Sequence, residues 1–101
     1  MMILPEFKLT ANPTDQAARE LQFNSWSDPE IGTRHKLGGK PDFIQSATWP
    51  KCKSCHDDMS FYCQVDSLND SNGEYDIGDC GMIYTFFCFD CNQAESIVQS
   101  Y

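Results

Sequence analysis

Two cysteine pairs are the residues of this chain whose types and spacing point most directly to chemistry. Cys52 and Cys55 in KCKSC, like Cys88 and Cys91 in FCFDC, are separated by two residues. A Cys-x-x-Cys turn presents two thiolates on one loop, and two such turns supply the four sulfurs that tetrahedral zinc accepts. Because four protein ligands leave no open coordination position, the pattern predicts a structural zinc ion that contributes to folding.

Three other chemistries compete for these sulfurs. A thioredoxin-like redox pair requires a βαβ context, which neither cysteine pair has. Disulfides require an oxidising compartment, whereas the start MMILPEFKLT lacks the basic segment and long apolar run of a signal peptide. The expected location is therefore the cytoplasm, where thiols stay reduced. His56 follows Cys55 directly, and a site in which its imidazole replaces one sulfur remains an open alternative.

The strands expected after the first cysteine pair would bring both pairs together. Residues 60–66 and 82–88 are predicted to pair as antiparallel strands around a midpoint next to Gly73. The first cysteine pair precedes one strand, and the second pair begins where the other strand ends. Both pairs therefore lie at the same end of the hairpin, and the hairpin accounts for most of the 32 residues between Cys55 and Cys88.

The side-chain pattern assigns a face to each of these strands. In SFYCQVDSL (60–68), alternation predicts that Phe61, Cys63 and Val65 face the core and that the residues between them face solvent. MIYTFFCF (82–89) is apolar on both faces and predicts a central strand covered on both sides. The two cysteines outside the pairs, Cys63 and Cys80, are predicted to be small buried apolar residues.

The remaining elements are short. EFKL (6–9) predicts a strand, TDQAARELQFN (14–24) a helix capped by Thr14 or Asp15, and SIVQSY (96–101) a last strand. The 101 residues are expected to form a single β-rich domain, a small α+β fold with an antiparallel sheet, a zinc-ribbon-like double cysteine knuckle and at most one short helix. No apolar run approaches the roughly 20 residues that cross a bilayer, so no membrane partner is expected.

HKLGGKPDFIQ (35–45) raises the question of a second functional site. The segment has neither the spacing of a phosphate-binding loop nor a following helix start, since Pro41 interrupts it. His35 is its one candidate general base, and no nucleophile motif lies nearby. The segment therefore predicts no enzyme activity, and Gly38-Gly39 instead predicts a sharp corner in the backbone.

Charge indicates which partner a surface of this protein would attract. Residues 1–53 hold seven Lys and Arg against six Asp and Glu, whereas residues 54–101 hold nine acidic residues and no Lys or Arg. Such a surface attracts basic proteins. The predicted function is to bind a basic partner protein without catalysis, as an immunity protein that neutralises a toxin or as a chaperone of a ribosomal-type client. The predicted partner-binding residues are Lys36, Gly38, Gly39, Gln45, Asp57, Asp58, Asp76 and Asp79.

Two alternatives come from other classes of function. A nucleic-acid- or ribosome-associated zinc-ribbon factor needs a basic stripe, and the acidic second half of the chain disfavours nucleic acid as a partner. Such a factor would depend on four lysines of the first half, Lys36, Lys40, Lys51 and Lys53. A metal-dependent hydrolase needs a coordination position occupied by water, which four cysteine ligands would not leave.

Four motifs in a fixed order resemble those of a known family. GGKPDFIQ, CKSC, SFYCQVD and GDCGMIYTFFCFDC are similar, in this order, to the YwqG-like family of bacterial proteins and to the carboxy-terminal domain of the programmed-cell-death-2 proteins. The resemblance covers residues 35–101, and residues 1–34 form an amino-terminal extension without family signal. The resemblance implies a β-rich domain with a pair of zinc knuckles. Eukaryotic relatives are associated with chaperoning a basic ribosomal protein, and bacterial relatives with toxin immunity or RNA-linked roles.

Overall fold

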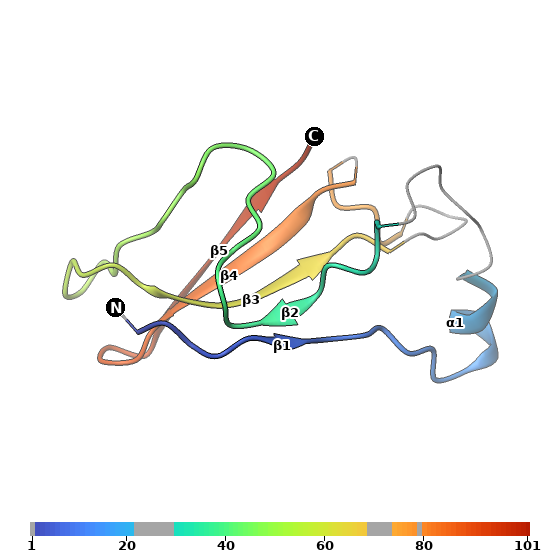
Figure 1. Cartoon of the computed structure of the whole chain (residues 1–101), viewed down its shortest axis with the longest axis horizontal. Coiled ribbons are helices and arrows are strands. Elements are labelled where there is room, and N and C mark those ends of the chain that lie inside the picture. The colour runs from blue at the N-terminus through green and yellow to red at the C-terminus, as the bar shows by residue number, and fades with distance from the viewer. Residues whose placement is uncertain (1, 22–29, 69–73, 79) are drawn as a thin grey trace.

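The computed structural model describes residues 2–21, 30–68, 74–78 and 80–101. A five-stranded antiparallel sheet follows the order of the chain and consists of β1 (Phe7–Lys8), β2 (Lys36–Leu37), β3 (Ser60–Asp66), β4 (Met82–Cys88) and β5 (Gln93–Gln99). One short helix, α1 (Gln16–Leu21), lies beyond one end of the sheet (Figure 1). The predicted fold class is confirmed, including the clustered cysteines. Within the described ranges, no helix is long and apolar enough to cross a membrane.

The helix begins where the sequence places a capping residue. The Asp15 carboxylate accepts a hydrogen bond from the Ala18 backbone N–H at 2.8 Å, which makes Asp15, and not Thr14, the N-cap. Residues 22–24, the predicted end of this helix, lie outside the described residues. No residue of α1 is buried, so the hydrophobic core belongs to the sheet.

The predicted facing of β3 is correct at its start and wrong at its end. A β-bulge lies between Phe61 and Cys63, where the pairing register with β4 shifts. The extra residue reverses the alternation, so Phe61 faces the core as predicted but Val65 is exposed. Gln64 and Asp66, predicted to face solvent, are instead 0% and 2% exposed. Beyond the bulge, β3 and β4 pair in the predicted register, from Cys63 with Thr85 to Asp66 with Met82.

The central strand β4 is covered on one face, not on both. It lies between β3 and β5 as predicted, and alternate residues from Met82 to Cys88 are buried. Ile83, Thr85 and Phe87 on the other face are half-buried. The core on the covered face consists of Cys52, Met59, Phe61, Met82, Tyr84, Phe86 and Cys88.

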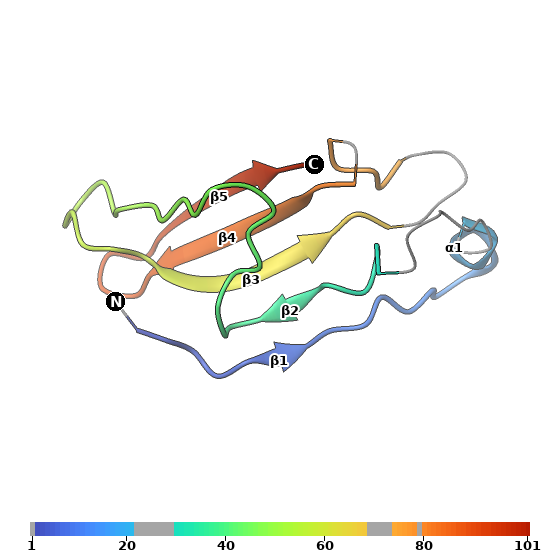
Figure 2. The ribbon, with the colours of Figure 1, turned by 45° about the horizontal axis from the view of Figure 1, so that its top comes forward.

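The long connection between β2 and β3 covers the core face of the sheet (Figures 1 and 2). Phe43, Ile44 and Trp49 of this connection pack against the core. Three buried polar side chains hold its backbone in place. On β3, Gln64 accepts from the Asp42 N–H at 3.0 Å; on β4, the Tyr84 hydroxyl donates to the Asp42 carbonyl at 2.7 Å; on β5, Gln99 accepts from the Gln45 N–H at 2.9 Å.

The predicted corner at Gly38-Gly39 is confirmed. Both glycines have left-handed φ angles, +64° and +70°. The Gly38 N–H donates to the Tyr62 carbonyl and the Gly39 N–H to the Leu4 carbonyl, both at 2.8 Å. A Cβ at Gly38 would overlap the Pro5 carbonyl oxygen, so the corner lies too close to the chain before β1 for a side chain to fit.

A buried ion pair holds the end of β3 that is remote from the cysteine pairs. The Asp66 carboxylate, which has no exposed surface, accepts two hydrogen bonds from the Arg34 guanidinium, at 2.6 and 2.8 Å. The same carboxylate accepts the Gly32 and Arg34 backbone N–H groups, and hydrogen bonding to Asp66 raises the pKa of Arg34. The guanidinium also donates to the Cys80 carbonyl and the Tyr101 hydroxyl. We call this region the arginine end of the hairpin.

Candidate metal centre

The first cysteine pair lies in a tight loop directly before β3. A bridge between Lys51 and Asp58 closes the loop, and the Cys52 N–H donates to the Asp57 carbonyl at 2.8 Å. The Cys52 sulfur accepts the Ser54 N–H at 3.4 Å, a contact that favours the thiolate form needed by a metal ligand. Backbone hydrogen bonds therefore fix this knuckle independently of any ligand.

The second cysteine pair occupies the turn between β4 and β5. Cys88 is the last residue of β4 and pairs with Gln93, the first residue of β5, so Cys91 lies inside the four-residue turn. The residue after each pair has a left-handed backbone, with φ of 65° at His56 and 54° at Asn92. Histidine and asparagine tolerate this conformation better than most residues. The two loops thus share a conformation at equivalent positions, a similarity that the spacing alone did not reveal.

The four sulfur atoms of the two pairs converge at the end of the sheet that we call the knuckle end. All four Sγ atoms lie within 4.8 Å of one another, and the Cys55 and Cys88 sulfurs are 3.7 Å apart. A tetrahedral metal with metal–sulfur bonds of about 2.3 Å requires sulfur–sulfur distances of about 3.8 Å. The four cysteines could therefore hold one metal ion with little movement. His56 is exposed and is not part of the cluster.

The proton affinities of the thiols fit a site that needs a cation. Hydrogen bonds from the Cys55 and Ser54 N–H groups lower the pKa of Cys52 to about 7. Contact with the Cys55 sulfur, together with burial, raises the pKa of Cys91 to about 12. The raised pKa of Cys91 thus opposes complete ionisation of the cluster, and a divalent cation at its centre would offset the repulsion between thiolates.

The cysteine cluster is continuous with the hydrophobic core. Cys52 and Cys88 are buried members of the core, and Cys55 and Cys91 pack against it. Four protein sulfurs around one ion leave no position for water or substrate. A metal ion bound by all four sulfurs would cross-link the loop before β3 to the turn after β4.

The structure separates the predicted partner-binding residues. Asp57 and Asp58 are exposed and adjacent at the knuckle end. Asp76 is half-buried near the arginine end, where its carboxylate accepts the Cys80 N–H at 2.7 Å. Asp79 lies outside the described residues. Among the described residues, Asp57 and Asp58 thus lie at one end of the hairpin and Asp76 lies near the other.

The predicted partner-binding residues of the glycine corner have structural contacts. The Lys36 ammonium is largely buried and pairs with Glu6 at 2.8 Å and Asp42 at 3.1 Å. The Gln45 side chain donates to the Ser100 carbonyl at 2.6 Å. Alternation did not reveal that Gln64 and Tyr84 hold this segment through hydrogen bonds to Asp42. Gln64 was expected to face solvent, and Tyr84 was expected to act only as an apolar residue of its strand.

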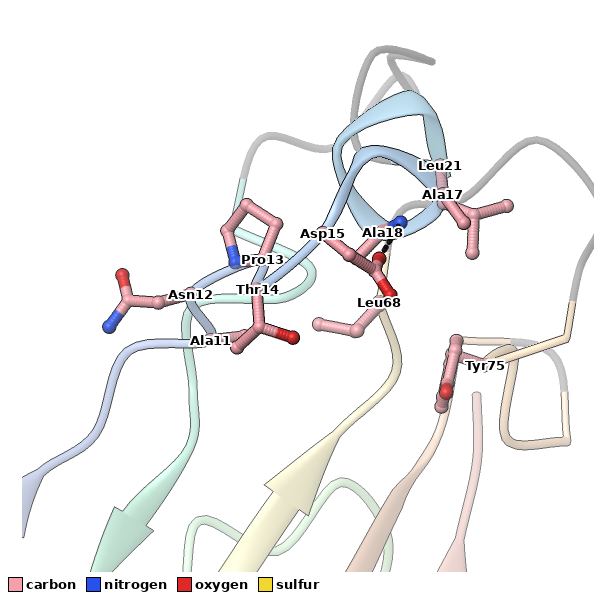
Figure 3. A pocket seen from close by; sticks show the side chains of 10 residues that line it. All are labelled: Ala11, Asn12, Pro13, Thr14, Asp15, Ala17, Ala18, Leu21, Leu68 and Tyr75. Carbon is pink, nitrogen blue, oxygen red and sulfur yellow. Dashed lines mark hydrogen bonds between the residues drawn. The ribbon is translucent and has the colours of Figure 1, made fainter.

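A hollow of about 390 Å³ lies between α1 and the loops that follow β3 (Figure 3). Its lining is mostly apolar, and Figure 3 shows the Asp15 carboxylate bonded to the Ala18 N–H at the start of the helix. The lining residues are Ala11, Asn12, Pro13, Thr14, Asp15, Ala17, Ala18, Leu21, Leu68 and Tyr75.

Fold and sulfur geometry together define a class of protein, a small antiparallel β-sheet domain with four clustered cysteines that could hold a metal ion. Comparison with protein-family models, curated proteins and solved structures finds no match to this chain. The resemblance to the YwqG-like family stays a prediction that rests on the order of its four motifs.

Proposed function

We propose that this protein is a non-catalytic, zinc-stabilised module that binds a basic partner protein. The observation that carries the proposal is the distribution of charge in the half of the chain that contains the cysteine cluster. Residues 54–101 contain nine acidic residues and no Lys or Arg, and Asp57, Asp58, Glu74 and Asp90 are exposed. An acidic surface of this kind accelerates and orients the association of a basic protein.

Zinc is the metal of this proposal. Tetrahedral sites of four thiolates select zinc or iron, and zinc has no redox chemistry that a structural site would have to suppress. Reduced thiols are needed for binding, which fits the expected cytoplasmic location. Metal analysis of the purified protein should find about one zinc per chain, and the cobalt-substituted protein should show the visible absorption of tetrahedral thiolate coordination. A red-brown protein that contains iron would contradict this choice.

Two biological roles are compatible with binding a basic protein, namely immunity against a basic toxin and chaperoning of a ribosomal-type client. The resemblance to the YwqG-like family and to the programmed-cell-death-2 proteins supports both roles and favours neither. The physical requirement is the same, because either partner presents Lys and Arg to an acidic surface. The identity of the captured partner separates them.

The test is capture of the partner on the immobilised, zinc-loaded chain. We expect one basic protein to be retained from the producing cell's lysate in about a 1:1 ratio and to elute as salt is raised. A control variant with Asp57, Asp58, Glu74 and Asp90 replaced by the corresponding amides should lose most of this retention. Retention of nucleic acid by the unmodified chain would instead support the ribosome-associated alternative. Retention of no macromolecule would overturn the proposal.

A further inference from the structure

The face of the sheet opposite the core carries exposed aromatic side chains close to the metal site. Tyr62 and Phe89 are each 43% exposed, and Phe87 is half-buried between them, with ring centroids 6.3 Å from Tyr62 and 4.8 Å from Phe89. We call Tyr62, Phe87 and Phe89 the aromatic cluster. Together with Thr85 they line an open hollow of about 370 Å³.

The aromatic cluster is not explained by the packing of the fold. The core lies on the other face, against the connection that contains Phe43, Ile44 and Trp49. Tyr62 is the extra residue of the bulge in β3 and lies beside Phe87, and bulges are over-represented next to functional sites. Two exposed rings, Tyr62 and Phe89, with the half-buried Phe87 between them mark an interaction surface more specifically than scattered apolar residues would.

Acidic side chains border the same rings. A second hollow, of about 250 Å³, shares Phe87 and Phe89 with the first and is bordered by three carboxylates, which we call the acidic rim: Asp57, Asp58 and Asp90. Asp58 pairs with Lys51 at 3.0 Å. Within the described part of the chain, Asp57 and Asp90 form no ion pair. The rim thus carries negative charge beyond what its one lysine neutralises.

This combination of rings and carboxylates selects one kind of ligand. Aromatic faces attract cations, and carboxylates bind guanidinium groups through paired, charge-assisted hydrogen bonds. Arginine satisfies both, since its planar group stacks on rings while its edge donates to carboxylates. We propose that the aromatic cluster and acidic rim dock an arginine-bearing segment of a partner protein. This inference rests on the proposed function and names the surface and the side chain through which that function operates.

Other occupants fit the same surface less well. A second copy of this chain also carries the net charge of −8, so long-range repulsion opposes its approach. Its Arg34 is already committed to Asp66. An anionic membrane surface would be repelled by the carboxylates of the rim. Charge complementarity therefore favours a basic protein segment.

The direct test titrates the zinc-loaded full chain with a peptide of repeated Gly-Ser-Arg units, followed by NMR of the backbone amides. We expect shift changes confined to the aromatic cluster and acidic rim. The matched peptide with citrulline in place of arginine keeps the shape and loses the charge, so its affinity should be at least about tenfold lower. Equal binding of both peptides would overturn the proposal.

Variants separate the specific surface from general acidity. Phe89→Ser and Asp90→Asn should each weaken binding about fivefold, because a cation–π contact or one charge-assisted pair is lost. Two controls should bind normally: Val98→Ser, an exposed residue elsewhere on the same face, and Glu20→Gln, an exposed acid on α1. Unchanged binding by Phe89→Ser, or a concentration-dependent dimer that buries the rings, would overturn the proposal.

The outcome for this surface is distinguishable from the outcome for the proposed function. If basic proteins bind but the shift changes fall on acids near the arginine end, such as Glu74 and Asp76, the docking surface is wrong and the proposed function stands. If neither the arginine peptide nor a basic protein binds at low salt, both fail.

Discussion

The two ends of the β3–β4 hairpin are held by different chemistry. At the knuckle end, four sulfurs from two local loops converge within 4.8 Å. At the arginine end, one buried carboxylate, Asp66, gathers Arg34 and two backbone N–H groups. A metal–thiolate site contributes folding free energy directly, whereas much of the gain from a buried ion pair is spent on desolvation. The comparison indicates that removing one side chain should lower the free energy of unfolding by different amounts at the two ends of the same hairpin.

Removal of a cysteine ligand should have the largest effect. In Cys88→Ser, a bound metal would keep only three thiolates, and a polar hydroxyl would replace a buried sulfur of the core. We therefore expect the variant to show no cooperative thermal unfolding transition above physiological temperature. The matched control is Cys63→Ser, because Cys63 is half-buried and lies outside the sulfur cluster. That control should lower the free energy of unfolding by only about 1 kcal/mol. Equal thermal midpoints for both variants would contradict a structural metal.

Breaking the arginine end should have the next largest effect. Asp66→Asn leaves the Arg34 guanidinium without its buried counter-charge, and we expect the free energy of unfolding to fall by about 3–5 kcal/mol. Urea denaturation measures this loss. Asp58→Asn, which breaks the exposed pair with Lys51, provides the control and should cost less than about 1 kcal/mol. If the two variants were equally stable, the two ends would not differ as described.

A change at the glycine corner should leave both ends intact. Gly38→Ala forces a side chain against the Pro5 carbonyl at a left-handed φ, and we expect a loss of about 2–3 kcal/mol. Gly39→Ala meets the flexible Glu6 side chain instead, so its cost should be nearer 1 kcal/mol. Hydrogen exchange should show faster exchange at residue 39, whose N–H bonds Leu4, while β4 stays protected. Loss of protection throughout the sheet would show that the corner and the two ends form one unit.

Alkaline pH should produce the smallest loss of stability, and this loss should arise from Lys36 on β2 and Tyr84 on β4. Burial alone would lower the pKa of Lys36, but Glu6 and Asp42 raise it above 10.5; burial also raises the pKa of Tyr84. Because both pKa values are higher in the folded state than in the unfolded state, the protonated forms of Lys36 and Tyr84 stabilise the fold. This stabilisation is fully present below about pH 10 and is lost as pH rises through the folded-state pKa values. Urea midpoints should therefore fall modestly as the pH rises above about 10. Lys36→Met should reduce this slope, and an unchanged slope would contradict the assignment.

The difference between the two ends also explains what the sequence could predict. Each cysteine pair is a local pattern, so residue types and spacing were sufficient to predict that these four cysteines cluster. The alternation and apolar content of the two strands likewise predicted that β3 pairs with β4. The arginine end joins Arg34 to Asp66, which are far apart in the sequence and carry no local pattern. The bulge at Phe61–Cys63 then turns Asp66 inward. Simple alternation cannot reveal a one-residue insertion whose position is set by pairing with β4.

The glycine corner was predictable for a related reason. Two adjacent glycines before a proline are a local conformational pattern, and both have left-handed φ. The burial of Lys36 was not predictable, because its ion pairs with Glu6 and Asp42 form only when β1 and the connection after β2 are in place. Backbone preferences can be read locally, whereas the exposure of a charge depends on the whole fold.

The order of the strands has a consequence for protein synthesis. Each strand pairs with the one before it in the chain, so the sheet can assemble as it leaves the ribosome, but the fourth sulfur arrives last. Cys91 follows Cys55 by 36 residues, which a ribosome adds in about 2–7 seconds at roughly 5–20 residues per second. During that interval the nascent chain carries an incomplete ligand set. A metal that needs all four sulfurs would therefore bind only after Cys91 has been added, just before β5 (Gln93–Gln99) completes the sheet.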